Sequence, residues 1–175
     1  KLNDDIYVTG NLGDSFVGLK ILKKEIKIQS SLQKYFINQF YLPNIPFKIS
    51  SKLNRFANTS IDISDGLVSD LMRLINKQDL SFEIFLNKIP ISKKLEFFFK
   101  KYRKKREKYL FSGDDYQILF TADKKKRYLI KSISSKINQK VTIIGKINNG
   151  FEKNMLRADN KSLNLSNYKG YFHNF

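Results

Sequence analysis

Residues 61–66 read IDISDG and place two carboxylates, a hydroxyl and a glycine where an apolar, β-like run gives way to a helical pattern. Asp62 stands between two isoleucines, so in a strand its side chain points away from the apolar face. Ser64 and Asp65 fall where the N-cap of the following helix is expected. Mg²⁺ usually takes one or two carboxylates together with substrate phosphates, and a helix start favours anions. The stretch therefore predicts either a metal and phosphate site or an ordinary capped helix after a turn.

Strand and helix patterns alternate on both sides of this stretch. In addition to the strand that ends before Ser64, strand patterns cover 5–9, 82–86, 116–121 and 141–147. Helical spacing covers 16–26, 33–41, 67–75, 93–109 and 129–137. Asn149 and Gly150 predict a hairpin from the last strand into 151–157. This order predicts an α+β fold with a mixed β-sheet covered by helices. Because no internal repeat or low-complexity linker is evident, we expect a single domain over residues 1–175.

Two local patterns refine these expectations. In the first helix, Phe16, Leu19, Leu22 and Ile26 are predicted to lie on one side. Asp14 or Ser15 is expected to cap that helix. Pro90 and Ser92 are expected to open the helix at 93–109.

Composition limits the class of protein. The chain has 175 residues, of which 41% are hydrophobic and 14% aromatic, which is enough apolar material for a core. No run of about 18 apolar residues predicts a membrane span. The first residues, KLNDD, do not resemble a secretory signal. The absence of Cys excludes disulfides and thiolate metal sites and fits a reducing compartment. We therefore expect a cytoplasmic protein without a membrane partner.

The formal net charge of +17 raises the alternative of a noncatalytic basic module that binds RNA or an anionic surface through 93–108. Only six of the 33 basic residues are Arg, the side chain suited to bidentate phosphate and base contacts. An AT-rich genome would also produce such a Lys excess. The segment 93–109 is interpreted mainly as an amphipathic helix with a solvated lysine face, a membrane-surface helix being the alternative. We expect no nucleic-acid partner.

The acidic residues are more informative than the basic ones. Half of the sixteen fall in three short clusters beside glycine-containing turns, where α/β-type proteins often bind ligands. They are Asp4, Asp5, Asp14, Asp62, Asp65, Asp70, Asp114 and Asp115.

Three stretches, in order, resemble the C-terminal half of thiamine-monophosphate kinases, members of the aminoimidazole ribonucleotide synthetase-like superfamily. They are IYVTGNLGDSFVGLKIL (6–22), SIDISDGLVSDL (60–71) and LFSGDDYQILFT (110–121). The closing YKGY (168–171) is similar to the family's tail motif. The resemblance implies a three-layer α/β/α-like C-terminal domain of an enzyme that uses ATP and Mg²⁺ to phosphorylate thiamine monophosphate. It also implies that the N-terminal half is absent here, that the full-length enzyme is a homodimer, and that this chain alone is inactive.

By the family's pattern, Asp62 and Asp65 match Mg²⁺ ligands, and Ser64 matches a residue that contacts ATP. Asp114 matches a substrate-binding acid, although the family usually has Glu there, one methylene longer. Tyr171 matches an aromatic residue that packs on the thiamine.

No catalytic nucleophile or general base is expected, because phosphoryl transfer depends mainly on positioning and charge neutralisation and the acceptor phosphate is already ionised. His173, the one histidine, is expected to be a bystander. A sister enzyme of the same superfamily that acts on another substrate remains an alternative.

Overall fold

The computed structural model describes residues 1–76, 78–158, 161–163 and 165. Tyr171, the closing motif at 168–171 and His173 lie outside these residues. The strands are β1 (Asp5–Thr9), β2 (Thr59–Asp62), β3 (Leu80–Phe85), β4 (Ile118–Ala122), β5 (Val141–Asn149), β6 (Met155–Ala158) and β7 (Lys161–Leu163). The helices are α1 (Asp14–Leu22), α2 (Ser30–Tyr41), α3 (Phe47–Ser50), α4 (Leu67–Leu74), α5 (Lys93–Lys101), α6 (Glu107–Leu110) and α7 (Arg127–Lys136).

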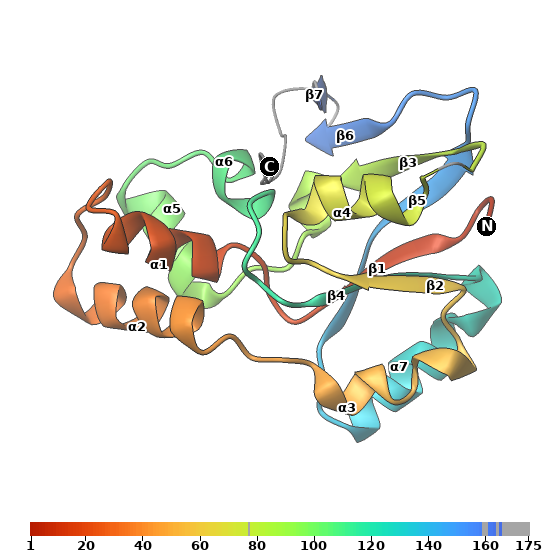
Figure 1. Ribbon diagram of the computed structural model, residues 1–175, viewed down its shortest axis with the longest axis horizontal. Coiled ribbons are helices and arrows are strands. Elements are labelled where there is room, and N and C mark those ends of the chain that lie inside the picture. Colours follow the sequence, from red (N-terminus) through yellow and green to blue (C-terminus); the bar gives the residue numbers. More distant parts are fainter. Residues whose placement is uncertain (77, 159–160, 164, 166–175) are drawn as a thin grey trace, which may run out of the picture.

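The strands form one mixed sheet in the order β2-β4-β1-β5-β3-β6-β7 (Figure 1). Every neighbouring pair is antiparallel except β3 and β6, which are parallel. Because β1 and β2 are both antiparallel to β4, their C-terminal ends lie at the same edge of the sheet as the N-terminal end of β4. This edge brings distant segments of the sequence together.

Helices cover both faces of the sheet, as alternation along β1 requires. Ile6 and Val8 belong to a core that also contains residues of α1, α2, α4, α5 and α6. Tyr7 points the other way, into a second cluster with Ile49 of α3 and Ile130 of α7. Figure 1 shows α1, α2, α5 and α6 gathered beyond one end of the sheet and α4 near β3. The expected α+β fold with a mixed, helix-covered sheet is confirmed. Within the described residues, no helix is long and apolar enough to cross a membrane.

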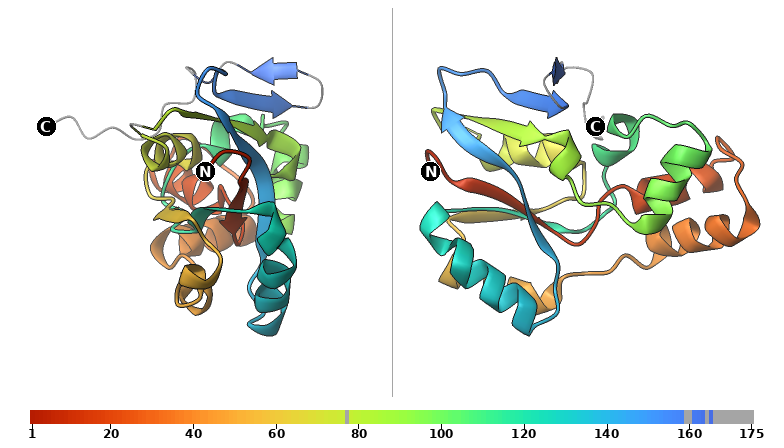
Figure 2. Two further views of the ribbon diagram at one scale, coloured as in Figure 1. Left: turned by 90° about the vertical axis from the view of Figure 1, so that its right-hand side faces the viewer. Right: turned by 180° about the vertical axis from the view of Figure 1, so that it is seen from behind.

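The predicted hairpin at Asn149 and Gly150 is wrong. The end of β5 is already paired with β3, with Leu80 opposite Asn149, so the following strand adds to the free side of β3. Figure 2 shows β6 and β7 beyond β3, far from α3 and α7. Gly150 donates to the carbonyl of Asp79 at 3.1 Å, which holds the turn against the start of β3. An Asn-Gly pair indicates a turn, but it does not determine which strand the next strand pairs with.

The most buried side of α1 is not the side that carries Phe16, Leu19 and Leu22. The helix buries Val17, Gly18 and Ile21, whereas Leu22 is exposed. The reason is a close crossing with α2, since a Cβ at position 18 would collide with the carbonyl oxygen of Phe36. The side of α1 that carries Gly18 therefore packs against α2.

The basic segment 93–109 forms two helices rather than one. Ser92 caps α5 as expected, accepting a hydrogen bond from the Leu95 amide at 3.0 Å. The helix ends at Lys101, and Arg103 has a positive φ of 49°. The chain turns back because Tyr109 packs edge-on against Phe98, with ring centroids 5.4 Å apart. We expected the aromatic patch Phe97–Phe99 to supply core: Phe98 and Phe99 are buried and do so, whereas Phe97 is 48% exposed.

Candidate functional site

Three loops meet at the sheet edge where β1 and β2 end and β4 begins. The Ile63 amide donates to the Gln117 carbonyl at 2.8 Å, and the Tyr116 amide donates to the Ile63 carbonyl at 2.9 Å. The Asp114 amide donates to the Ser64 carbonyl at 2.9 Å. The 61–66 and 112–116 turns, about fifty residues apart in sequence, are thus joined backbone to backbone.

Both turns contain residues with positive φ values, and in both a glycine lies directly against the backbone of the other turn. Gly66 has φ 126°, and a Cβ there would collide with the Phe111 carbonyl oxygen. Asp114 and Tyr116 have positive φ values of 67° and 50°, which are costly for residues other than glycine. A Cβ at Gly113 would collide with the Ser64 carbonyl oxygen. The two turns are therefore locked to each other by steric fit as well as by hydrogen bonds.

The structure places Asp62 and Ser64 at this edge. Asp62 is the exposed last residue of β2, and Ile63 beside it is fully buried, so the outward orientation of this carboxylate is confirmed. Ser64 is partly buried, and its carbonyl joins the two turns.

Asp65 does not cap α4, and neither does Ser64. Gly66 occupies the N-cap position, and no side chain caps the helix there. Instead, the Asp70 carboxylate of the first helical turn accepts hydrogen bonds from the amides of Asp65 at 3.1 Å and Gly66 at 3.0 Å. The side chain of Asp65 is left to pair with Arg73. The expected capping role is wrong because α4 starts at Leu67, so Gly66 rather than Ser64 or Asp65 occupies the N-cap position.

Asp114 lies close enough to Asp65 for the two carboxylates to interact. Partial burial raises the pKa of Asp114, the neighbouring Asp65 raises it further, and Lys23 opposes these effects. The structure therefore brings Ser64, Asp65 and Asp114 together, with Asp62 on the adjoining strand end. Tyr171 lies outside the described residues. In the described part of the chain, no three His, Cys, Asp or Glu side chains form a group that could hold a metal ion.

Three further polar residues shape this edge: the sequence analysis counted Asp70 and Asp115 among the clustered acids without giving either a role, and it did not single out Arg73. Asp115 is fully enclosed, and the Gly13 amide donates to its two carboxylate oxygens at 3.0 and 2.9 Å. Burial raises the pKa of Asp115 well above its usual value. Asp115 thus ties the first loop to the third. Gly13, in a left-handed conformation, is the N-cap of α1, and no side chain provides the cap predicted from Asp14 or Ser15. The i, i+3 spacing of Asp70 and Arg73 was the one available signal.

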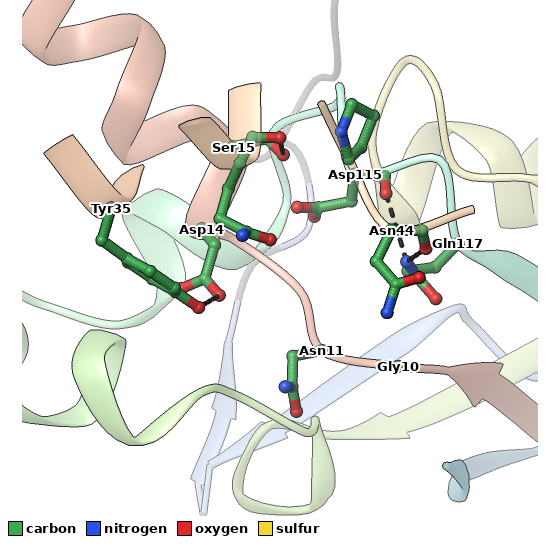
Figure 3. A pocket seen from close by; sticks show the side chains of 10 residues that line it. Gly10, Asn11, Asp14, Ser15, Tyr35, Asn44, Asp115 and Gln117 are labelled. Atoms are coloured by element: carbon green, nitrogen blue, oxygen red, sulfur yellow. Dashed lines mark hydrogen bonds between the residues drawn. The ribbon is translucent and has the colours of Figure 1, made fainter. Parts of the chain in front are cut away.

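A polar cavity of about 280 Å³ lies beside the first loop (Figure 3). Asp14 there accepts hydrogen bonds from the hydroxyls of Tyr35 at 2.9 Å and Ser92 at 2.8 Å, and burial raises its pKa. Gln117 accepts from Thr9 and donates to the Asn44 carbonyl, each at 2.8 Å. None of the four predicted site residues that the structure describes lines this cavity. Its lining is Gly10, Asn11, Asp14, Ser15, Tyr35, Gln39, Pro43, Asn44, Asp115 and Gln117.

The helix-covered mixed sheet presents two acidic, glycine-containing turns side by side at one edge. Residues 3–156 match the family described as AIR synthase related protein, C-terminal domain. The chain belongs to this family.

Several similar proteins are named thiamine-monophosphate kinase. Thiamine-monophosphate kinase from Buchnera aphidicola subsp. Acyrthosiphon pisum is 36% identical over 98% of this chain and 53% of that protein. The crystal structure of thiamine monophosphate kinase from Aquifex aeolicus is 32% identical, with a TM-score of 0.74 over 93% of this chain and 52% of that one. The structure of AaThiL complexed with AMPPCP and TMP is 31% identical, with a TM-score of 0.77 over 97% and 51%. The chain spans about half the length of the curated relatives it matches.

Proposed function

We propose that this chain is the C-terminal domain of a thiamine-monophosphate kinase, which uses ATP and Mg²⁺ to phosphorylate thiamine monophosphate to thiamine diphosphate. The observation that carries the proposal is the meeting of the 61–66 and 112–116 turns, joined by the 2.9 Å hydrogen bond between Asp114 and Ser64. Relatives that are 36% identical bear this name. The similar AaThiL structure contains AMPPCP and TMP, which supports ATP and thiamine monophosphate as the substrates.

In this proposal, Asp62 and Asp65 hold Mg²⁺, Ser64 contacts ATP, and Asp114 binds the substrate. Tyr171 packs on the thiamine ring. The exposed position of Asp62 and the location of Ser64, Asp65 and Asp114 at one edge support these roles.

The donor set fits a magnesium ion that is only partly held by this chain. Asp65 already pairs with a cationic guanidinium, so its carboxylate lies where a cation is stabilised. Mg²⁺ commonly binds through one or two carboxylates and completes its shell with phosphates and water. Bound there, the ion would supply neutralisation of phosphate charge.

The chain's remaining task is to position ATP and the acceptor phosphate relative to each other. The acceptor is a phosphate that is ionised at neutral pH, so no strong base is required. Backbone contacts between the two turns fix the spacing between the residues proposed for ATP and those proposed for the substrate. A sister enzyme would share this geometry, and the relatives' names favour thiamine monophosphate over another substrate.

We also propose that the rest of the enzyme packs against this edge and that the full-length protein is a homodimer. Four large apolar side chains between α2 and the start of α3 are more than half exposed: Tyr41, Leu42, Ile45 and Phe47. This segment borders the site, because Gln117 bonds both to the Asn44 carbonyl and, through its own carbonyl, to Ile63. A single neighbouring domain could cover the apolar segment and complete the metal site. The chain alone is accordingly expected to be inactive.

The proposal includes a cytoplasmic location and no nucleic-acid partner. The absence of Cys fits a reducing compartment. Burial of Phe98 and Phe99 supports the interpretation of the basic segment as core with a solvated lysine face.

An assay of the full-length protein with ATP, Mg²⁺ and thiamine monophosphate tests the function. Thiamine diphosphate should form, and other phosphate or carboxylate acceptors tested in parallel should react far more slowly. Preference for one of those acceptors would support the sister-enzyme alternative. Thiamine diphosphate formed by the isolated chain would contradict its expected inactivity.

A further inference from the structure

Arg73 links the two carboxylates that flank the start of α4. Its Nη1 donates to Asp65 Oδ2 and, at 3.2 Å, to Asp70 Oδ1. The Asp70 side chain is fully buried, that of Asp65 is 15% exposed, and that of Arg73 is 49% exposed. The half-exposed guanidinium of Arg73 therefore contacts Asp65, the carboxylate for which a metal-binding role is proposed.

The two carboxylates differ in their other partners. Asp70 Oδ2 accepts the amides of Asp65 and Gly66, so Asp70 is held by the backbone independently of Arg73. The side-chain hydrogen bond described for Asp65 is the one from Arg73. Arg73 can therefore leave Asp65 and keep Asp70 as its partner, because only one of its two contacts has to break.

A divalent cation and Arg73 cannot share Asp65 without cost. A guanidinium stays protonated at any physiological pH, so it cannot lose its charge when a metal approaches. Two like charges a few ångströms apart repel even near the protein surface. An ion bound to Asp65 Oδ2 would stand within that range of Nη1.

We propose that Arg73 is a built-in competitor for the metal at Asp65, which it must release before a divalent cation binds there. This inference rests on the proposed metal role of Asp65. Its consequence is that the bare ion binds weakly, whereas an ion that arrives with nucleotide phosphates gains additional ligands and displaces Arg73. Arg73 thereby favours the metal–nucleotide complex over the free metal.

The pair formed by Arg127 and Asp5 provides a matched control. Arg127 is also about half exposed, and Asp5 is also nearly buried. This pair is bidentate, with Nε to Oδ2 at 2.6 Å and Nη2 to Oδ1 at 2.8 Å. Replacing either arginine by glutamine changes the net charge by the same amount, but only Arg73 contacts Asp65.

The experiment titrates Mn²⁺ alone into the ¹⁵N-labelled full-length protein and follows paramagnetic broadening of the Asp65 and Gly66 amides. The spectra also report whether each variant is folded. In Arg73→Gln, the Mn²⁺ concentration for half-broadening should fall about fivefold, the effect expected from removing an exposed ion pair and its repulsion. Arg127→Gln should behave like the unchanged chain, and Asp65→Asn should lose the broadening.

The outcomes separate the two levels of the claim. Broadening that depends on Asp65 but is the same in Arg73→Gln and the unchanged chain would overturn the competitor role and leave the metal role intact. An equal gain in Arg127→Gln would show a general effect of net charge and would also overturn it. No broadening at Asp65 and Gly66 in any of these proteins would contradict the metal role itself.

Discussion

Two groups of aspartates lie at the same edge of the sheet but are held in different ways. Asp14 and Asp115 are buried, and their carboxylates accept hydrogen bonds from Tyr35, Ser92 and Gly13. Asp62 is exposed, and Asp65 pairs with a half-exposed arginine. A carboxylate satisfied by fixed internal donors stabilises a fold, whereas one that faces solvent is available to a ligand. Clustered acidic residues therefore indicate where the site lies in the sheet. The hydrogen-bond partners of each carboxylate distinguish a structural role from a ligand-binding role.

The largest expected effect is on activity, from the solvent-facing group. In the full-length protein, Asp62→Asn should lower kcat by roughly 10²-fold, since removing one preorganised charge interaction commonly costs this much. The thermal unfolding midpoint should stay unchanged because Asp62 is exposed. Steady-state kinetics and a melting curve measure both quantities. Unchanged activity would remove Asp62 from the mechanism.

The buried group should show the opposite pattern, with stability affected first. Asp115→Ala leaves the enclosed Gly13 amide without its acceptor, which should lower the free energy of unfolding by about 1–3 kcal/mol. Urea denaturation of the isolated chain measures the loss. Glu96→Ala, which breaks an exposed pair with Lys100, is the control and should leave stability almost unchanged. Equal losses in the two variants would abolish the distinction between the groups.

The smallest effect concerns pH. Because burial raises the pKa of Asp115, the folded chain holds this proton more tightly than the unfolded chain. Its contribution therefore favours folding at low pH and weakens as pH rises above about 3.9, the value of an unfolded aspartate, towards the raised pKa. The stability of the unchanged chain minus that of Asp115→Asn should fall across this window. Urea midpoints measured at several pH values would show it, and a rising difference would have the wrong sign.

Much of the fold follows from local pattern. The strand at 5–9 is found at its predicted bounds, and Ser92 caps its helix as its residue type indicates. The errors concern choices made by distant neighbours. The partner of β6 depends on β3 already occupying the end of β5, and the buried face of α1 depends on its contact with α2. No spacing within either segment contains that information.

The candidate site divides in the same way. The outward orientation of Asp62 follows from alternation along a strand, and the structure agrees. The capping expected of Asp65 fails because the helix starts one residue later, with Gly66 as its N-cap. The role of Asp115 could not be assigned because its partner Gly13 lies about a hundred residues away. Residue types therefore indicate which end of the sheet carries the candidate site. The hydrogen-bond partner of each carboxylate becomes known only from the three-dimensional structure.

The most direct test of the central claim is a crystal structure of the full-length protein with Mg²⁺ and a nonhydrolysable ATP analogue. We expect carboxylate oxygens of Asp62 and Asp65 at about 2.0–2.1 Å from a magnesium ion that also binds the analogue's phosphates. Arg73 should then contact Asp70 but no longer Asp65. Density that places the Asp62 and Asp65 side chains in solvent or in local contacts alone, with the metal and phosphates held elsewhere, would contradict the account.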